Sequence, residues 1–194
     1  DAEQTFLEMI SIAEKAGLEE ALSFALGNIG NVYDTLGELQ KALECHERSL
    51  KIAEQIGNLE GQARTLGNIG SVYLSQSDLN RASDYYQRAL EIAEKIGDLE
   101  VQANQLSGIA LVYQALGKSK RALEFHQRAL KIHEKIEDLE GQAKDLGNMG
   151  VVQRILGELG KALEYYEKAL EIINYDCNSN SYSYYYSDSG QNQT

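Results

Sequence analysis

The chain has 194 residues, with 18 Lys and Arg against 30 Asp and Glu, so its formal net charge is −12. This acidity excludes nucleic acid and anionic membrane surfaces as partners, because binding to either needs clustered basic side chains. The sequence also contains no apolar run of membrane-spanning length, no signal-peptide pattern, and only Cys45 and Cys177, which stand in unlike contexts, so we expect a cytoplasmic protein without disulfides.

A period of 40 residues organises most of the chain. The tripeptide Leu-Gly-Asn begins at residues 26, 66 and 146, with Leu-Ser-Gly in the remaining slot at 106, and alanine stands at 42, 82, 122 and 162. A fixed period of this length indicates a solenoid of stacked repeats. The prevalence of Ala, Leu, Glu and Lys and the lack of Pro predict an all-α fold. We divide residues 18–174 into four repeats: 23–62, 63–102, 103–142 and 143–174.

The N-terminal segment keeps the same register. Phe6 and Met9 lie 40 residues before His46 and Ser49, which belong to the second helix of the first repeat. Residues 1–17 are therefore predicted to form the second helix of an incomplete repeat. Because the chain also starts at Asp1 without a methionine, we expect a fragment of a longer array.

Each repeat is predicted to form a helical hairpin. With Ser23 as position 1, apolar or small residues at positions 4, 7, 8 and 11 form one face of a first helix, which a glycine at position 15 ends. In the second helix, Ala42 and His46 lie on the inward face at positions 20 and 24. Asn58, replaced by aspartate at 98 and 138, is expected to cap the next first helix. The first-helix stripe of repeat one comprises Leu26, Ile29, Gly30 and Tyr33.

This pattern resembles the tetratricopeptide repeat (TPR) from residue 23 to about 174. It has Gly at position 8, Tyr at 11, Gly at 15, Ala at 20, an aromatic residue or His at 24 and Ala at 27. The 40-residue period with Leu-Gly-Asn is similar to the LGN/Pins subgroup and to related prokaryotic TPR arrays. The resemblance implies a right-handed α-solenoid that acts as a protein-interaction scaffold or adaptor. The departures from the pattern are Ser49, Ser77, Ala110 and Gln153.

The first helices of such an array line its concave wall, where an extended peptide would bind. An Asn side chain offers both a donor and an acceptor to a peptide backbone, and the resemblance implies peptide contact for Asn at position 6. The alternatives for these asparagines are hydrogen bonds between repeats or simple solvent exposure. The predicted peptide-binding residues are Asn28, Asn31, Arg64, Asn68, Ser71, Asn104, Leu111, Gln114, Lys144, Asn148, Val151 and Arg154.

Glycines inside the first helices fall into two sets. Those at residues 30, 70 and 150 lie on the packing face, where the missing Cβ lets the two helices of a hairpin approach closely. Those at 27, 67 and 147 lie on the groove wall. They either leave room for a ligand or relieve crowding against the neighbouring repeat and set the curvature.

The charge of the first helices predicts the type of ligand. Positions 1–14 of the four repeats carry Arg64, Lys144 and Arg154 against Asp34 and Asp145, a balance of +1 on an otherwise acidic body. An extended peptide with some acidic side chains would fit this balance. The lysine at position 5 that the chaperone-binding TPRs use is Gly or Ser here, which excludes a chaperone C-terminal tail.

The sequence contains no constellation that indicates catalysis, a metal or a cofactor. His46 and His126 both occupy position 24, two repeats apart, and are expected to be packing residues. His133 has no ligand partner at helical spacing, and the acidic residues read as solvent-facing runs. We therefore predict that the protein is not an enzyme.

The composition changes after Asn174. Residues 175–194 are rich in Tyr, Ser and Asn, which is typical of a flexible, adhesive extension. One hypothesis places this tail in a TPR groove as a substitute ligand. A second function therefore remains open beside peptide binding: a structural module that self-associates through its solenoid ends and this tail.

Overall fold

The chain folds into helices throughout the region that the structure describes. The computed structural model describes the backbone of residues 2–188 and the side chains of residues 4–174. Over residues 2–188 it contains nine helices and no strand. The helices are α1 (Ala2–Ala16), α2 (Glu19–Thr35), α3 (Leu39–Gln55), α4 (Leu59–Ser75), α5 (Leu79–Ile96), α6 (Leu99–Ala115), α7 (Ser119–Lys135), α8 (Leu139–Ile155) and α9 (Leu159–Asp188). None of these helices is long and apolar enough to span a membrane.

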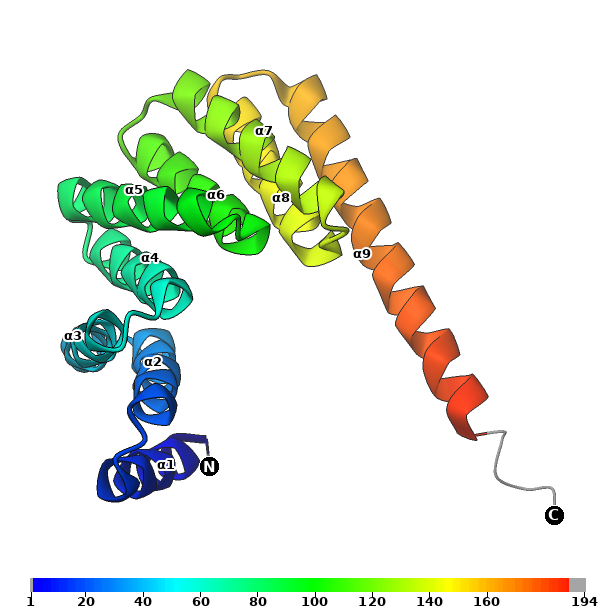
Figure 1. Cartoon of the computed structure of the whole chain (residues 1–194). Coiled ribbons are helices and arrows are strands. Elements are labelled where there is room, and N and C mark those ends of the chain that lie inside the picture. Colours follow the sequence, from blue (N-terminus) through cyan, green and yellow to red (C-terminus); the bar gives the residue numbers. More distant parts are fainter. Residues whose placement is uncertain (1, 189–194) are drawn as a thin grey trace, which may run out of the picture.

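The helices form an open arc in which each packs against the next one along the chain. The first helices of the hairpins, α2, α4, α6 and α8, also contact one another in sequence and lie on the inner side of the arc, whereas α3, α5 and α7 lie on the outer side (Figure 1). This is the arrangement expected for stacked hairpins, in which each repeat buries its apolar face against its neighbours.

Short local signals set where the helices begin and end. The side chains of Asn58, Asp98 and Asp138 accept hydrogen bonds from the backbone N–H three residues later, at 2.9–3.0 Å, which confirms the predicted N-caps. Asp78 caps α5 in the same way. A residue in the left-handed region ends most helices; it is usually glycine but is Ser77 after α4 and Glu137 after α7, with φ values of 60° and 58°.

Glycine allows the two helices of a hairpin to pack closely, as predicted for the glycines at residues 30, 70 and 150. A Cβ added to Gly30 would lie 2.6 Å from the imidazole Cε1 of His46, and one added to Gly70 would lie 2.9 Å from the ring of Tyr86. At Gly150 the ring is that of Tyr166, again at 2.6 Å. A glycine on the first helix therefore faces a ring at position 24 of the second helix in three of the four hairpins.

The structure contradicts the hypothesis that the tail lies in the groove of its own chain, as far as the tail's backbone is described; the alternative, the groove of a neighbouring molecule, stays a prediction. The helix α9 continues without a break through residue 174 to Asp188. Its C-terminal half projects away from the other helices (Figure 1). The last six residues, 189–194, lie outside the described region. Residues 175–188 therefore extend a helix instead of filling the concave side.

His46 is fully buried in the first hairpin, and neither of its ring nitrogens has a hydrogen-bond partner among the described residues. Burial lowers the pKa of His46 to about 4, because the charged imidazolium cannot be solvated there. His46 is therefore a neutral packing residue, as the sequence predicted.

Gly70 and Gly147, one glycine from each set, are predicted to respond in opposite ways to an added methyl group. Gly70→Ala should destabilise the fold by about 1–2 kcal/mol, because Tyr86 is only 4% exposed and the overpacking cost exceeds the gain in helix propensity. Gly147→Ala should stabilise it by about 0.5–1 kcal/mol, since nothing lies within 4 Å of the added Cβ. Urea unfolding followed by circular dichroism measures both. Equal stability of the two variants would contradict this assignment.

The buried His46 predicts a loss of stability in mild acid. The unfolded chain takes up a proton near pH 6.5, whereas folded His46 does so only near pH 4, so its contribution is complete above pH 6.5 and falls as the pH drops toward 4. The loss should reach roughly 3 kcal/mol. His46→Phe removes the titration and keeps a ring, as Phe6 does at the equivalent position. If the variant and the wild type lost stability in parallel between pH 6.5 and 4, this explanation would be wrong.

Candidate functional site: the concave groove

A polar groove of about 810 Å³ runs along the inner side of the arc. Its walls come mainly from α2, α4 and α6, with single residues from α3, α5 and α8, so it crosses all four repeats. Side chains at positions 2, 5, 6 and 9 of the first helices point into it, because they lie opposite the buried stripe. The regular stacking of the hairpins thus converts a 40-residue sequence period into a continuous surface.

Most of the predicted peptide-binding residues gather in this groove. Eight of them line it, and Asn148 lines an adjoining pocket. Gln114, Val151 and Arg154 line neither cavity. The role of all twelve residues in binding a peptide stays a prediction. The eight in the groove are Asn28, Asn31, Arg64, Asn68, Ser71, Asn104, Leu111 and Lys144.

The asparagines at position 6 differ in whether their side-chain amides already form hydrogen bonds within the protein. The amide of Asn28 donates to the backbone oxygen of Phe24 at 3.1 Å and is therefore engaged with its own helix. Within the described region, Asn68 and Asn148 make no side-chain hydrogen bond although both line a cavity. These two amides hold unused donors and acceptors at the groove wall.

The groove glycines divide between the two predicted explanations. A Cβ at Gly67 would lie 2.5 Å from Oε1 of Gln105, so this glycine relieves crowding against the next repeat. At Gly147 nothing lies within 4 Å, so the missing side chain leaves open space. Gly27 has only an ordinary contact at 3.7 Å, to Ser49.

A ring from the preceding repeat explains why the third repeat lacks an asparagine at position 6. A Cβ on Gly108 would lie 2.6 Å from Cε1 of Tyr86, and the hydroxyl of Tyr86 reaches the groove, where it pairs with Ser71 at 2.9 Å. The shorter rings of His46 and His126 precede the repeats that do carry Asn68 and Asn148. The sequence contained this signal: Tyr at position 24 is followed by Gly at position 6 of the next repeat, and His is followed by Asn.

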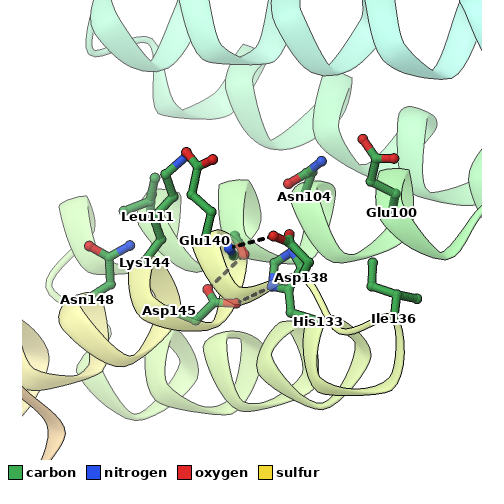
Figure 2. Close-up of a pocket in the computed structure, with 12 residues that line it drawn as sticks. Glu100, Asn104, Leu111, His133, Ile136, Asp138, Glu140, Lys144, Asp145 and Asn148 are labelled. Carbon is green, nitrogen blue, oxygen red and sulfur yellow. Dashed lines mark hydrogen bonds and ion pairs between the residues drawn. The ribbon is translucent and has the colours of Figure 1, made fainter. Parts of the chain in front are cut away.

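Beside the groove, a pocket of about 780 Å³ lies between the third and fourth repeats. We call it the repeat 3–4 pocket. Figure 2 shows Glu100 and Asn104 of α6 on one side of it, and Asp138 and Ile136 from the α7–α8 turn on the other. Its floor contains the side chains of His133 and Asp145.

Asp145 lies at the centre of a buried polar cluster that the sequence analysis missed. Its carboxylate is 2.8 Å from Nδ1 of His126 and 2.9 Å from Nδ1 of His133, and it accepts a 2.8 Å hydrogen bond from Ser107. The prediction that Asp145 contributes a free charge to the groove was wrong, because its side chain is 1% exposed and is bonded within this cluster. The partners stand 12 and 19 residues before Asp145 on another helix, so helical spacing could not reveal them.

These hydrogen bonds determine the protonation pattern of the cluster. Burial alone would raise the pKa of Asp145, but hydrogen bonds from His126, His133 and Ser107 hold it below its ordinary value. An ionised carboxylate only accepts, so both imidazoles carry their proton on Nδ1. In the described structure neither Nε2 has a hydrogen-bond partner.

The lining of both cavities is more acidic than the first-helix count predicted. The glutamates at residues 20, 60, 100 and 140 lie in the first turns of α2, α4, α6 and α8 and line one or both cavities. With Asp138 they outnumber the two cationic residues of the lining, Arg64 and Lys144. The positive balance came from counting only positions 1–14, which omits this turn. The groove is therefore acidic.

The arrangement suits recognition of a ligand by polar contacts. Among the described residues, no group of three or more His, Cys, Asp or Glu side chains is arranged to hold a metal ion. The lining instead offers free amides, hydroxyl groups and carboxylates along one continuous wall. Such groups form hydrogen bonds and ion pairs with an extended chain.

Several solved structures have a similar fold. BtubC (BKLC) from P. vanneervenii is 23% identical with a TM-score of 0.72, covering 88% of this chain and 74% of that one. The apo form of RapI is 20% identical with a TM-score of 0.72, covering 83% of this chain and 58% of that one. A Rap protein complexed with Competence and Sporulation Factor is 16% identical with a TM-score of 0.75, and the match covers 79% of this chain and 43% of that one. At these identities the likeness concerns the fold alone, and this chain spans less than two thirds of either Rap protein.

The family assignment comes from the sequence of the repeats. Among curated proteins, none matches this chain. The tetratricopeptide repeat family matches residues 1–95 and 102–174, which is most of the chain. The structural likeness agrees with that match and confirms the predicted all-α solenoid. The chain is a member of the tetratricopeptide repeat family.

Proposed function

We propose that this protein is an interaction scaffold that binds an extended peptide segment of a partner protein in the concave groove. The observation that carries the proposal is the continuous groove of about 810 Å³, whose wall presents amides without partners. A peptide backbone would satisfy these amides whatever its side chains are. The Rap protein seen with Competence and Sporulation Factor supports the idea that this fold accommodates a signalling molecule.

The charge of the lining argues for a different ligand from the one that the sequence indicated. An acidic peptide would face the carboxylates of residues 20, 60 and 100 along the groove and only two cations, Arg64 and Lys144. Like charges across an interface disfavour binding, and opposite charges speed association. We therefore favour peptides that carry basic side chains over acidic ones. A cytoplasmic location and the absence of catalysis belong to the same proposal.

The free asparagines give the sharpest test of the groove. A peptide array probed with the whole chain should show binding that Asn68→Ala and Asn148→Ala each weaken by about fivefold to tenfold, since each removes one or two hydrogen bonds of about 1 kcal/mol. Asn28→Ala should have a smaller effect, because that amide already bonds to Phe24.

The matched control is Asn80→Ala, which removes an exposed amide from α5 on the outer side of the arc. It should leave binding unchanged. If peptides bound with the same affinity to the Asn68 and Asn148 variants as to the wild type, the groove would not be the binding site.

The last helix favours self-association as a second candidate function. The side chains of Leu159, Leu163 and Leu170 on α9 are 66%, 58% and 57% exposed. By contrast Leu43 of α3, which is the equivalent of Leu163 in the first repeat, is 7% exposed. An apolar stripe of this kind is typical of a surface that another protein covers.

Light scattering distinguishes self-association from peptide binding alone. If α9 mediates it, the wild type should form dimers or larger assemblies as its concentration rises, and Leu163→Glu should remain monomeric. The exposed Leu116→Glu, between α6 and α7, is the control and should behave as the wild type. A wild type that is monomeric at all concentrations would eliminate this candidate.

A further inference from the structure

Glu100 in the inner wall lacks the cation that its equivalents in the second and fourth repeats possess, as does Glu20, which Phe24 follows one turn later. Glu60 pairs with Arg64 at 3.3 Å and Glu140 pairs with Lys144 at 2.6 Å, each across one helical turn. In the third repeat the residue one turn after Glu100 is Asn104, which carries no charge. Among the described side chains, Glu100 has neither an ion pair nor a hydrogen bond.

The groups around Glu100 in the repeat 3–4 pocket are mostly acceptors. Asp138 faces Glu100 across the pocket (Figure 2); its Oδ1 accepts from the backbone N–H of Gly141, and its Oδ2 lies 3.5 Å from Nε2 of His133. The one cation in the lining, Lys144, is held by Glu140. The pocket therefore presents carboxylate oxygens to which no cation in the described chain is bound.

A buried imidazole gives a second, independent indication of a ligand. His133 is only 2% exposed and lines the same pocket, and its Nε2 has no hydrogen-bond partner. Its Nδ1 lies 2.9 Å from Asp145, and its Nε2 lies 3.5 Å from Oδ2 of Asp138 without forming a hydrogen bond. A ligand that donates hydrogen bonds would satisfy the Asp138 carboxylate beside this ring.

Apolar side chains complete the shape of the site. Ile136 and Leu111, both half-buried, line the pocket along with its carboxylates. A long aliphatic chain that ends in a cation would bury its methylene groups on these residues and direct its charge toward the acceptors.

From this geometry we propose that the repeat 3–4 pocket binds a basic side chain, arginine or lysine, of the peptide held in the groove. Glu100 and Asp138 accept its hydrogen bonds, and Asn104 leaves the space that a cation fills in the second and fourth repeats. The inference deepens the proposed function and rests on it for the peptide nature of the ligand.

The probe for this site is N-acetyl-arginine methylamide, titrated into the ¹⁵N-labelled full chain and followed by amide NMR shifts. Shifts should concentrate at Glu100, Asn104, Asp138 and Gly141. The citrulline counterpart, which has the same shape without the charge, should bind about tenfold more weakly or not at all. Equal shifts with the two compounds, or shifts spread outside the pocket, would overturn the proposal.

Variants of the chain distinguish binding at this pocket from a general attraction of the cation to the acidic surface. Glu100→Gln and Asp138→Asn should each weaken binding of the arginine derivative about tenfold, and Asp138→Asn keeps the helix cap because Asn58 occupies the same position in the second repeat. Glu60→Gln is the control and should bind as the wild type, since Arg64 already neutralises that carboxylate.

A substitution that supplies the missing cation is the strictest test. Asn104→Lys reproduces the Glu140–Lys144 pair of the fourth repeat and should abolish binding of the arginine derivative without loss of stability. Full binding by this variant would overturn the proposal. So would a doubly protonated His133 in the unliganded chain at neutral pH, seen in its imidazole ¹⁵N shifts, because its Nε2 would then donate to Asp138.

The failure of this inference differs from the failure of the proposed function. Peptides that bind through Asn68 without any enrichment of arginine or lysine would remove the basic subsite and leave the groove. Conversely, binding of the arginine derivative in the pocket, with no peptide bound by the array, would keep the subsite and remove the peptide-binding scaffold.

Discussion

The contact between a ring on the second helix and a glycine on the first is the interaction on which the rest of this structure depends. It brings the two helices of a hairpin together at Gly30 and His46, at Gly70 and Tyr86, and at Gly150 and Tyr166. Each interior glycine costs a helix about 1 kcal/mol relative to alanine. Close packing of a buried ring offsets that cost, and the same contact orients the opposite face of the first helix toward the concave side.

The choice of ring then determines what the groove contains one repeat later. Tyr86 is long enough to cross from Gly70 to Gly108 and to place its hydroxyl beside Ser71, so no side chain fits at residue 108. The shorter His46 and His126 are followed by Asn68 and Asn148, whose amides remain free. A residue chosen for packing inside one hairpin thus decides which polar group the next hairpin offers to a ligand.

The sequence was sufficient to predict features that repeat and insufficient for features that occur once. The hairpins, the caps at Asn58 and Asp138 and the close contacts of Gly30 and Gly70 recur with the period, so several copies of each signal support one another. The cluster around Asp145 occurs at a single junction. It joins side chains of three helices, and neither helical spacing nor the repeat period predicts a contact of that kind.

The predicted and the observed charge of the groove also differ because of contacts between helices, which the sequence of one helix does not reveal. Counting positions 1–14 treated each first helix in isolation, but stacking brings the first turn of one helix next to the middle of its neighbour, which adds the glutamates to the wall. Two of them, Glu60 and Glu140, carry a cation one turn later and are neutralised within their own helix. Glu100 is not, because Asn104 stands where Arg64 and Lys144 stand in the second and fourth repeats. This uncharged residue lies at the one described junction where Nε2 of a buried imidazole, His133, is 3.5 Å from a carboxylate oxygen of Asp138.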